Sequence, residues 1–101
     1  MECYILIRKV SDQNNVHYYA VFKKDNETEI SYYIGLDSDR KKIYFYNDHL
    51  FKNPSCIYDQ NHDRFEKTDQ QMLPLLNGKV IRKALKALRN NNFPQSISWE
   101  G

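Results

Sequence analysis

The chain has 101 residues, 41% of them hydrophobic and 28% charged, which suits one globular domain with one core and argues against a disordered chain. Its formal net charge is +2, but the charged residues are unevenly distributed along the chain. Residues 1–78 hold 10 Lys and Arg against 12 Asp and Glu (net −2), whereas residues 79–101 hold five cations against Glu100 alone (net +4). The chain is therefore polarised rather than basic.

The ends of the chain and its cysteines give no sign of export, membrane insertion or metal binding. The start, MECYILIRKV, has an acid before its apolar run and no cleavage site, which indicates a strand rather than a signal peptide. No apolar stretch reaches the roughly 18 residues of a membrane span. Cys3 and Cys56 lack the spacing of a zinc site or redox pair. We therefore expect a cytoplasmic protein with reduced thiols, no metal and no membrane contact.

Four runs of apolar and aromatic residues, bounded by Asp, Asn and Ser, predict four strands in the first half of the chain. They are CYILIRKV from Cys3, VHYYAVF from Val16, EISYYIGL from Glu29 and KIYFY from Lys42. The connections SDQNN, KKDNE and DSDRK are short and rich in turn formers, which favours hairpins. The pattern predicts an antiparallel meander.

Alternation along these strands assigns their side chains to two faces. We expect the core face to hold the more apolar set, namely Val16, Tyr18, Ala20, Phe22, Ile30, Tyr32, Ile34, Leu36, Ile43 and Phe45. The opposite face is then rich in tyrosine, and its aromatic members are His17, Tyr19, Tyr33, Tyr44 and Tyr46.

The middle of the chain is less regular. Residues 47–67 show no sustained period, which predicts a long connection, with an edge strand near residues 55–58 as an option. Thr68 and Gln71 have the spacing of a capping box, which predicts a helix start just before Met72. Pro74 limits that helix, so either a broken helical region or a turn before the main helix fits.

The clearest helical period begins after Asn77, which can cap a helix over residues 78–90. One side of this helix is apolar: Val80, Ile81, Ala84, Leu85 and Leu88. After it, Ile97 and Trp99 have strand spacing, and the tail can add an edge strand. We expect a single α+β domain spanning residues 1–101, with an antiparallel sheet of four or five strands and one main C-terminal amphipathic helix packed on one face.

The cations of this helix are the first candidate site. Lys79, Arg82, Lys83, Lys86 and Arg89 fall within an arc of about 120° opposite the apolar side, and no acid neutralises them within the helix. Such a stripe suits a phosphate backbone or an acidic protein surface. It is equally what a solvated helix face looks like, and it lacks the interleaved aromatic residues that stack bases.

The tyrosine-rich sheet face is the second candidate. Tyr19, Tyr33, Tyr44 and Tyr46, with His17 beside them, would form an amphipathic patch of the kind found in binding hot spots. The sequence pattern of RNA-recognition sheets is absent. The alternative is that tyrosine simply favours strands and that the loop or tail covers this face.

A third candidate comprises loop residues that could act as a general base or metal ligands: Asp48, His49, Asp59, His62 and Asp63. Their spacing matches no metal motif. Neither serine nor cysteine lies in a glycine-bracketed elbow, and only three glycines are present, so no phosphate-cradling loop or cofactor site is expected. A hydrolase built on His49 and His62 is therefore the third choice, and we expect no enzyme.

Small chains rich in Asn, Lys, Tyr and Ile, with an aromatic surface and no active-site motif, have a bacterial character and are similar in general to immunity proteins. No motif carries this similarity, so no residue roles follow from it. It implies a non-enzymatic protein-binding module that neutralises a toxin domain by occlusion. The alternative is a small RNA- or DNA-binding regulator that uses the basic helix, and exposed edge strands would also allow a homodimer.

Overall fold

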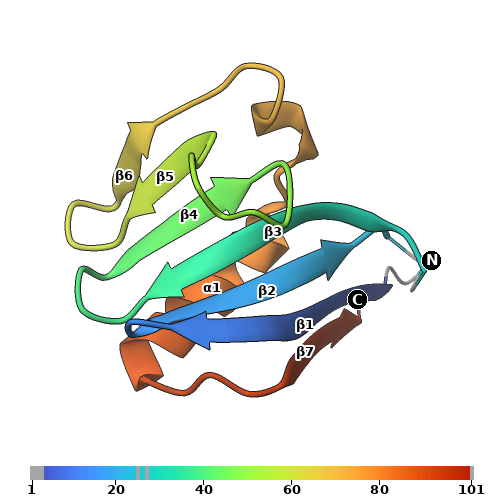
Figure 1. The fold of residues 1–101 in the computed structure, drawn as a ribbon, viewed down its shortest axis with the longest axis horizontal. Coiled ribbons are helices and arrows are strands. Elements are labelled where there is room, and N and C mark those ends of the chain that lie inside the picture. Colours follow the sequence, from blue (N-terminus) through green and yellow to red (C-terminus); the bar gives the residue numbers. More distant parts are fainter. Residues whose placement is uncertain (1–3, 25, 27, 101) are drawn as a thin grey trace.

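The computed structural model describes residues 4–24, 26 and 28–100, so Cys3 lies outside the described residues. Seven strands form one antiparallel sheet in the order β6-β5-β4-β3-β2-β1-β7, and one helix packs behind it (Figure 1). The elements are β1 (Tyr4–Gln13), β2 (Val16–Phe22), β3 (Ile30–Asp37), β4 (Lys42–Tyr46), β5 (Cys56–Asp59), β6 (Arg64–Lys67), a 3-10 helix (Leu73–Leu75), α1 (Gly78–Asn90) and β7 (Ser96–Glu100).

The α+β class, the antiparallel meander and the C-terminal helix are as expected, but the strand count of four or five is too low. The additional strands come from the irregular part of the chain. β5 and β6 form a hairpin of two four-residue strands within the segment expected to be mainly a loop. β7 returns to pair with β1. β5 and β7 correspond to the two optional edge strands, near residues 55–58 and in the tail, whereas β6, with four residues, carries too little alternation to be recognised in the sequence.

The first hairpin is tighter than the expected SDQNN loop. β1 continues to Gln13, and the turn consists of Asn14 and Asn15, whose φ angles are 51° and 66°. Two successive residues with positive φ make the turn type whose twist matches paired strands, and asparagine tolerates this conformation better than most residues. Ser11, Asp12 and Gln13 therefore pair with β2 rather than forming a loop.

The expectation of a capping box at Thr68 is wrong. Asp69 accepts hydrogen bonds from the backbone N–H groups of Gln71 (2.8 Å) and Met72 (3.2 Å), and only the 3-10 turn around Pro74 follows. Proline suits the first positions of a helix but prevents longer continuation here. The second option, a turn before the main helix, is the one observed.

α1 spans the expected residues. Asn77 caps it by accepting a hydrogen bond from the Lys79 backbone N–H (2.8 Å), and Asn91 ends it in the left-handed conformation at φ 50°. Its buried residues are Val80, Ala84, Ala87 and Leu88. They join one hydrophobic cluster with the sheet, which includes Ile5, Ile7, Tyr19, Val21, Tyr32, Ile34, Leu36, Ile43, Phe45, Cys56 and Met72.

The two faces of β2 are the reverse of those expected. Tyr19 pairs with Ile34 and Val21 pairs with Tyr32, so Tyr19 and Val21 point toward α1. Tyr18 and Ala20 accordingly belong to the opposite face, and the pairing with β3 becomes irregular between Val21 and Phe22. In the sequence VHYYAVF, apolar residues occupy both alternating positions, so the pattern alone does not identify the buried side.

Replacement of Leu88 by alanine tests the packing of α1 on the sheet. Leu88 is 0% exposed, so Leu88→Ala should lower the free energy of unfolding by about 2–5 kcal/mol through lost burial and a new cavity. Leu75→Ala is the matched control because Leu75 is 51% exposed, and its effect should be about 0.5 kcal/mol or less. Equal losses in urea titrations of the two variants would contradict this packing.

Candidate functional site

The sheet face turned away from α1 carries a group of aromatic side chains that we call the outer aromatic face: Tyr18, Tyr33, Tyr44, Tyr46 and Phe51. Strand pairing brings the four tyrosines together, because Tyr18 and Tyr44 flank Gly35 from opposite sides and Tyr33 is directly opposite Tyr46. Residues that pair across antiparallel strands project to the same side.

Phe51 reaches this face from the connection between β4 and β5, which crosses the sheet on the side away from α1 (Figure 1). Its ring stacks on Tyr18 with a centroid separation of 4.3 Å. It also makes edge contacts with Tyr33 (5.6 Å) and Tyr46 (5.5 Å). Phe51 adopts a positive φ of 54°, a strained conformation for a bulky residue. The ring contacts of Phe51 therefore offset the free-energy cost of its backbone conformation.

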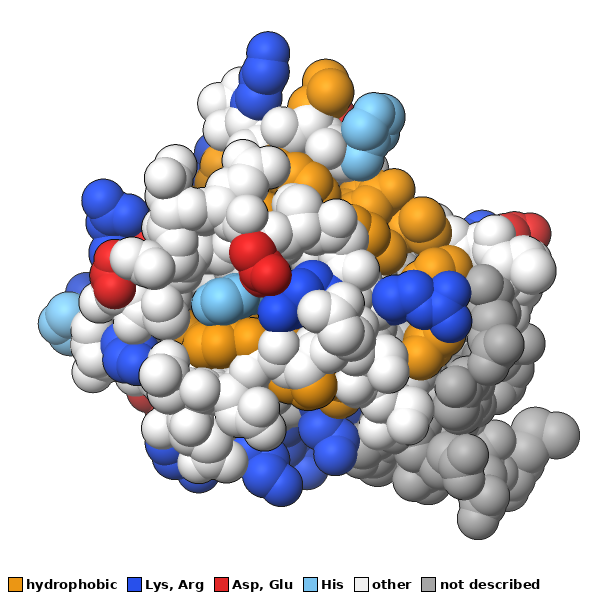
Figure 2. All heavy atoms as spheres, turned by 60° about the horizontal axis from the view of Figure 1, so that its bottom comes forward, with side chains coloured by type: hydrophobic (Ala, Val, Ile, Leu, Met, Phe, Trp, Pro, Cys, Tyr) orange, Lys and Arg blue, Asp and Glu red, His pale blue; other side chains and the backbone are white. Residues whose placement is uncertain are grey.

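The connection covers the face only in part. Tyr46 is buried, whereas Tyr18, Tyr33, Tyr44 and Phe51 keep intermediate exposure. Next to Phe51, Leu50 is 58% exposed. Figure 2 shows hydrophobic side chains gathered in the upper part of the view, on the side of the sheet away from α1. A loop therefore covers Tyr46, as the alternative interpretation of this face expected, but it leaves the rest of the face partly exposed.

Gly35 lies beneath the rings of this face. A Cβ atom at this position would lie 3.0 Å from Cε1 of Tyr18 and 3.3 Å from Cε2 of Tyr46. The absence of a side chain on β3 therefore lets two neighbouring tyrosines lean over the strand, a known role of glycine in sheets.

Asp37 anchors the margin of the outer aromatic face. Its buried carboxylate accepts hydrogen bonds from the Tyr44 hydroxyl (2.8 Å), from Nη1 of Arg40 (3.1 Å) and from the backbone N–H groups of Asp39 and Arg40. Burial alone would raise the pKa of Asp37, but these donors outweigh it and lower the pKa. Burial, together with Asp37, raises the pKa of Tyr44 to about 12. Tyr44 is therefore a fixed hydrogen-bond donor at neutral pH.

Two residues expected on this face lie on the other one. Tyr19 is 0% exposed beside α1 and donates a hydrogen bond to the Pro94 carbonyl (2.8 Å). His17 stacks on Phe93 at 3.8 Å, with its Nδ1 atom 2.6 Å from Oδ1 of Asp12. Both therefore hold the segment that follows α1. This correction follows from the reversed faces of β2.

The five helix cations project away from the core, as the helical period predicts. Arg82, Lys86 and Arg89 are exposed, and four of the five line a shallow crevice of about 160 Å³: Lys79, Arg82, Lys83 and Lys86. Within the described part of the chain, ion pairs do not involve Arg82, Lys83, Lys86 or Arg89. Basic side chains lie along the lower edge of Figure 2. This basic helix face is on the opposite side of the sheet from the outer aromatic face.

The histidines of the third candidate belong to different connections. His49 is exposed between β4 and β5, and His62 lies in the β5–β6 turn with its Nδ1 atom 2.5 Å from Oδ2 of Asp59. In the same turn the Tyr58 hydroxyl contacts Asp63. Among the described residues, no group of three or more His, Cys, Asp or Glu side chains could hold a metal ion. Asp59 and His62 instead stabilise the turn.

Comparison of the chain with protein-family models, curated proteins and solved structures found no match. In the described residues, neither the length nor the polarity of the helices would allow one to cross a membrane. Of the members of the outer aromatic face, the sequence identified Tyr33, Tyr44 and Tyr46. It missed Tyr18, which lies next to the residue chosen in its place, and Phe51, which has no periodic signal in its loop.

Replacement of Gly35 by alanine tests the packing of the outer aromatic face. Gly35→Ala should lower the free energy of unfolding by about 1 kcal/mol or more, because the added methyl group presses on Tyr18 and Tyr46. Gly78→Ala is the control, since nothing lies within 4 Å of a Cβ there and alanine favours a helix. Chemical denaturation should show opposite signs, and a stabilised Gly35→Ala would contradict the crowding.

Asp37 should make stability depend on pH. Because the pKa of Asp37 is lowered in the folded protein, its contribution to stability is present above the ordinary carboxyl pKa of 3.8 and is lost as the pH falls through the folded pKa. Asp37→Asn should therefore destabilise the protein at neutral pH, and its deficit relative to wild type should shrink in acid. Urea titrations between about pH 2 and 7 measure this, with Asp39→Asn as the control for one lost charge. A pH-independent deficit would contradict the lowered pKa.

Proposed function

We propose that this protein is a non-enzymatic protein-binding module whose interface is the outer aromatic face. The observation that carries the proposal is the half-exposed cluster of Tyr18, Tyr33 and Phe51 with Leu50 beside it. Tyrosine and phenylalanine are enriched in protein interfaces, and tyrosine gives large contact area at a small cost in side-chain entropy. Exposed apolar patches on small proteins commonly mark interaction sites.

The rigidity of this face supports the proposal. Tyr46 is buried, Tyr44 is fixed by Asp37, and the Phe51 ring contacts three tyrosines at once. Side chains that are already ordered lose little freedom on binding, which favours affinity. The most specific form of the proposal is an immunity-type protein of a bacterial cytoplasm, which covers the active cleft of a toxin domain. An aromatic surface on a seven-stranded sheet suits occlusion of a partner.

The test compares two surface variants of the tagged protein in its native lysate. Tyr33→Ala combined with Leu50→Ala should weaken capture of a stoichiometric protein partner at least tenfold, because central interface residues contribute most of the binding energy. Lys83→Glu combined with Lys86→Glu is the control on the opposite face and should leave capture unchanged. Quantitative pull-downs followed by titration calorimetry with the purified partner measure both effects.

Further outcomes of this experiment separate the alternatives. Capture that survives nuclease and high salt supports the protein-binding proposal, and a partner that arrests growth unless this chain is co-expressed supports the immunity-type form. Capture that is insensitive to Tyr33→Ala with Leu50→Ala overturns the choice of surface. If light scattering shows that the purified chain is a dimer and that the same substitutions make it a monomer, the partner is a second copy.

Nucleic-acid binding by the basic helix face is the second candidate. The crevice lined by Lys79, Arg82, Lys83 and Lys86 concentrates positive charge over about two turns of α1. A phosphate backbone bound there should give an affinity that falls with salt, with a log–log slope of about −0.7 to −0.9 per phosphate contact. In this case the charge reversals at Lys83 and Lys86 abolish binding in gel-shift assays, whereas the Tyr33 and Leu50 substitutions leave it intact.

A further inference from the structure

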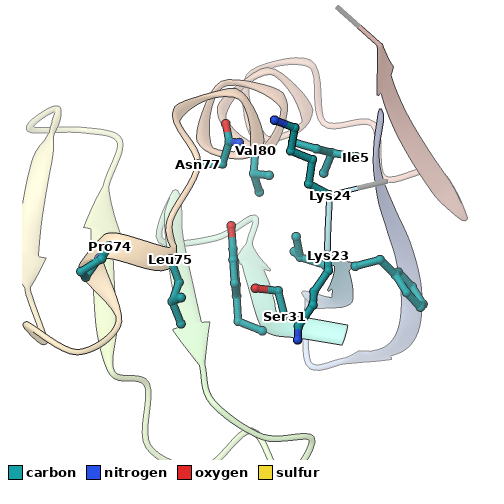
Figure 3. Close-up of a pocket in the computed structure, with 11 residues that line it drawn as sticks. Ile5, Lys23, Lys24, Ser31, Pro74, Leu75, Asn77 and Val80 are labelled. Carbon is teal, nitrogen blue, oxygen red and sulfur yellow. The ribbon is translucent and has the colours of Figure 1, made fainter. Parts of the chain in front are cut away.

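A pocket of about 340 Å³ lies on the α1 side of the sheet, away from the outer aromatic face. It is formed where the start of β1, the end of β2 and the start of β3 meet the 3-10 helix and the first turn of α1. Figure 3 shows Pro74 and Leu75 on one side of it, Lys23 and Lys24 on the other, and Asn77 and Val80 toward α1. Its volume is at the lower end of the range of about 300–1,000 Å³ typical of small-molecule sites.

The walls of the pocket are mainly apolar and also include five polar residues. Apolar surface comes from Ile5, Val21, Phe22, Pro74, Leu75 and Val80. The polar lining consists of Lys23, Lys24, Ser31, Tyr32 and Asn77. An apolar cavity with a few convergent polar groups is the usual construction of a ligand site.

Tyr32 is the unusual member of this lining. It is 2% exposed, and its hydroxyl group has no hydrogen-bond partner of normal geometry among the described residues. Burial raises the pKa of Tyr32 to about 12, while the nearby backbone N–H of Asn77 acts in the opposite direction. The hydroxyl therefore keeps its proton at neutral pH but has no acceptor for it. Buried donors are rarely left without a partner, because that costs free energy.

The Tyr32 hydroxyl lies near a donor, the backbone N–H of Asn77 at the N-terminus of α1. The N-terminus of α1 carries backbone N–H groups without helical partners and the positive end of the helix dipole. Lys23 and Lys24 lie at the side of the pocket, and Lys23 pairs with Glu29 at 2.8 Å. Asp25 and Glu27 of the same connection lie outside the described residues. The group that best complements this region is an anionic acceptor.

We propose that this pocket binds a small amphipathic monocarboxylate. Its apolar body packs against Ile5, Val21 and Val80, and its carboxylate accepts the Tyr32 hydrogen bond at the N-terminus of α1. The pocket and the outer aromatic face are on opposite sides of the sheet, so this site does not depend on the proposed protein-binding function.

Titration of the isotopically labelled protein with hexanoate, followed by amide chemical shifts, tests the proposal. Hexanoate has the required chemistry, and a ligand of its size binds with a Kd of about a millimolar when it fits its site. Saturable shifts are expected at residues 21–23, 31–32 and 77–80. Hexylammonium, which has the same chain and the opposite charge, should bind at least tenfold more weakly if the donors select a carboxylate.

Two matched variants examine the role of the hydroxyl. Tyr32→Phe should bind hexanoate about tenfold more weakly, since one hydrogen bond to a charged group is lost. The same change should leave the melting temperature of the ligand-free protein unchanged or raise it, because a buried donor without an acceptor is removed. Tyr33→Phe, one residue along and on the outer aromatic face, should change neither quantity.

Each other result overturns the proposal. No saturable shift with hexanoate, or shifts scattered over the surface, would mean that the pocket does not bind this class of ligand. Equal affinity for hexanoate and hexylammonium would mean that the site does not select a carboxylate and binds the hydrocarbon chain alone. Undiminished hexanoate affinity in Tyr32→Phe would remove Tyr32 from it, and a lower melting temperature of ligand-free Tyr32→Phe would show that the hydroxyl already has a partner.

Discussion

The packing of α1 on one face of the sheet is the constraint from which the other features follow. The chain has a single α-helix among its described residues, and its buried side chains reach only the face that holds Ile34, Leu36 and Phe45. A sheet needs cover on each apolar face. The second face therefore has to be covered by whatever the connections provide, which here is one loop carrying Phe51.

Because the connection that carries Phe51 covers it only in part, the outer aromatic face is both well packed and accessible to solvent. Phe51 and Gly35 allow Tyr18 and Tyr46 to pack closely, while Asp37 satisfies the hydroxyl of Tyr44. The surface is thus an ordered layer of packed rings, in which the Tyr44 hydroxyl is paired with Asp37. Leu50 remains 58% exposed at the margin of this face, so apolar surface there stays in contact with solvent.

The sequence predicted the parts of the fold in which apolar residues follow a single period. In β3, β4 and α1 the apolar residues favour one side, and those faces were assigned correctly except at Ile30, which is 40% exposed where the pairing of β2 with β3 becomes irregular. In β2 both alternating sets are apolar, so pairing with β3 decides the orientation, and pairing is not a local property. For the same reason Phe51 was missed: its contacts with β2, β3 and β4 come from tertiary structure, not from its neighbours in sequence.

Tyr44 and Tyr32 illustrate how the same residue type can have different roles on the two faces. Both are on central strands, and the pKa of each is raised to about 12. Tyr44 donates to Asp37, so its hydroxyl is explained by the fold itself. Tyr32 donates to no described residue, although phenylalanine would fill the same space without an orphaned donor. Folding therefore accounts for the hydroxyl of Tyr44, whereas the proposed monocarboxylate would account for that of Tyr32.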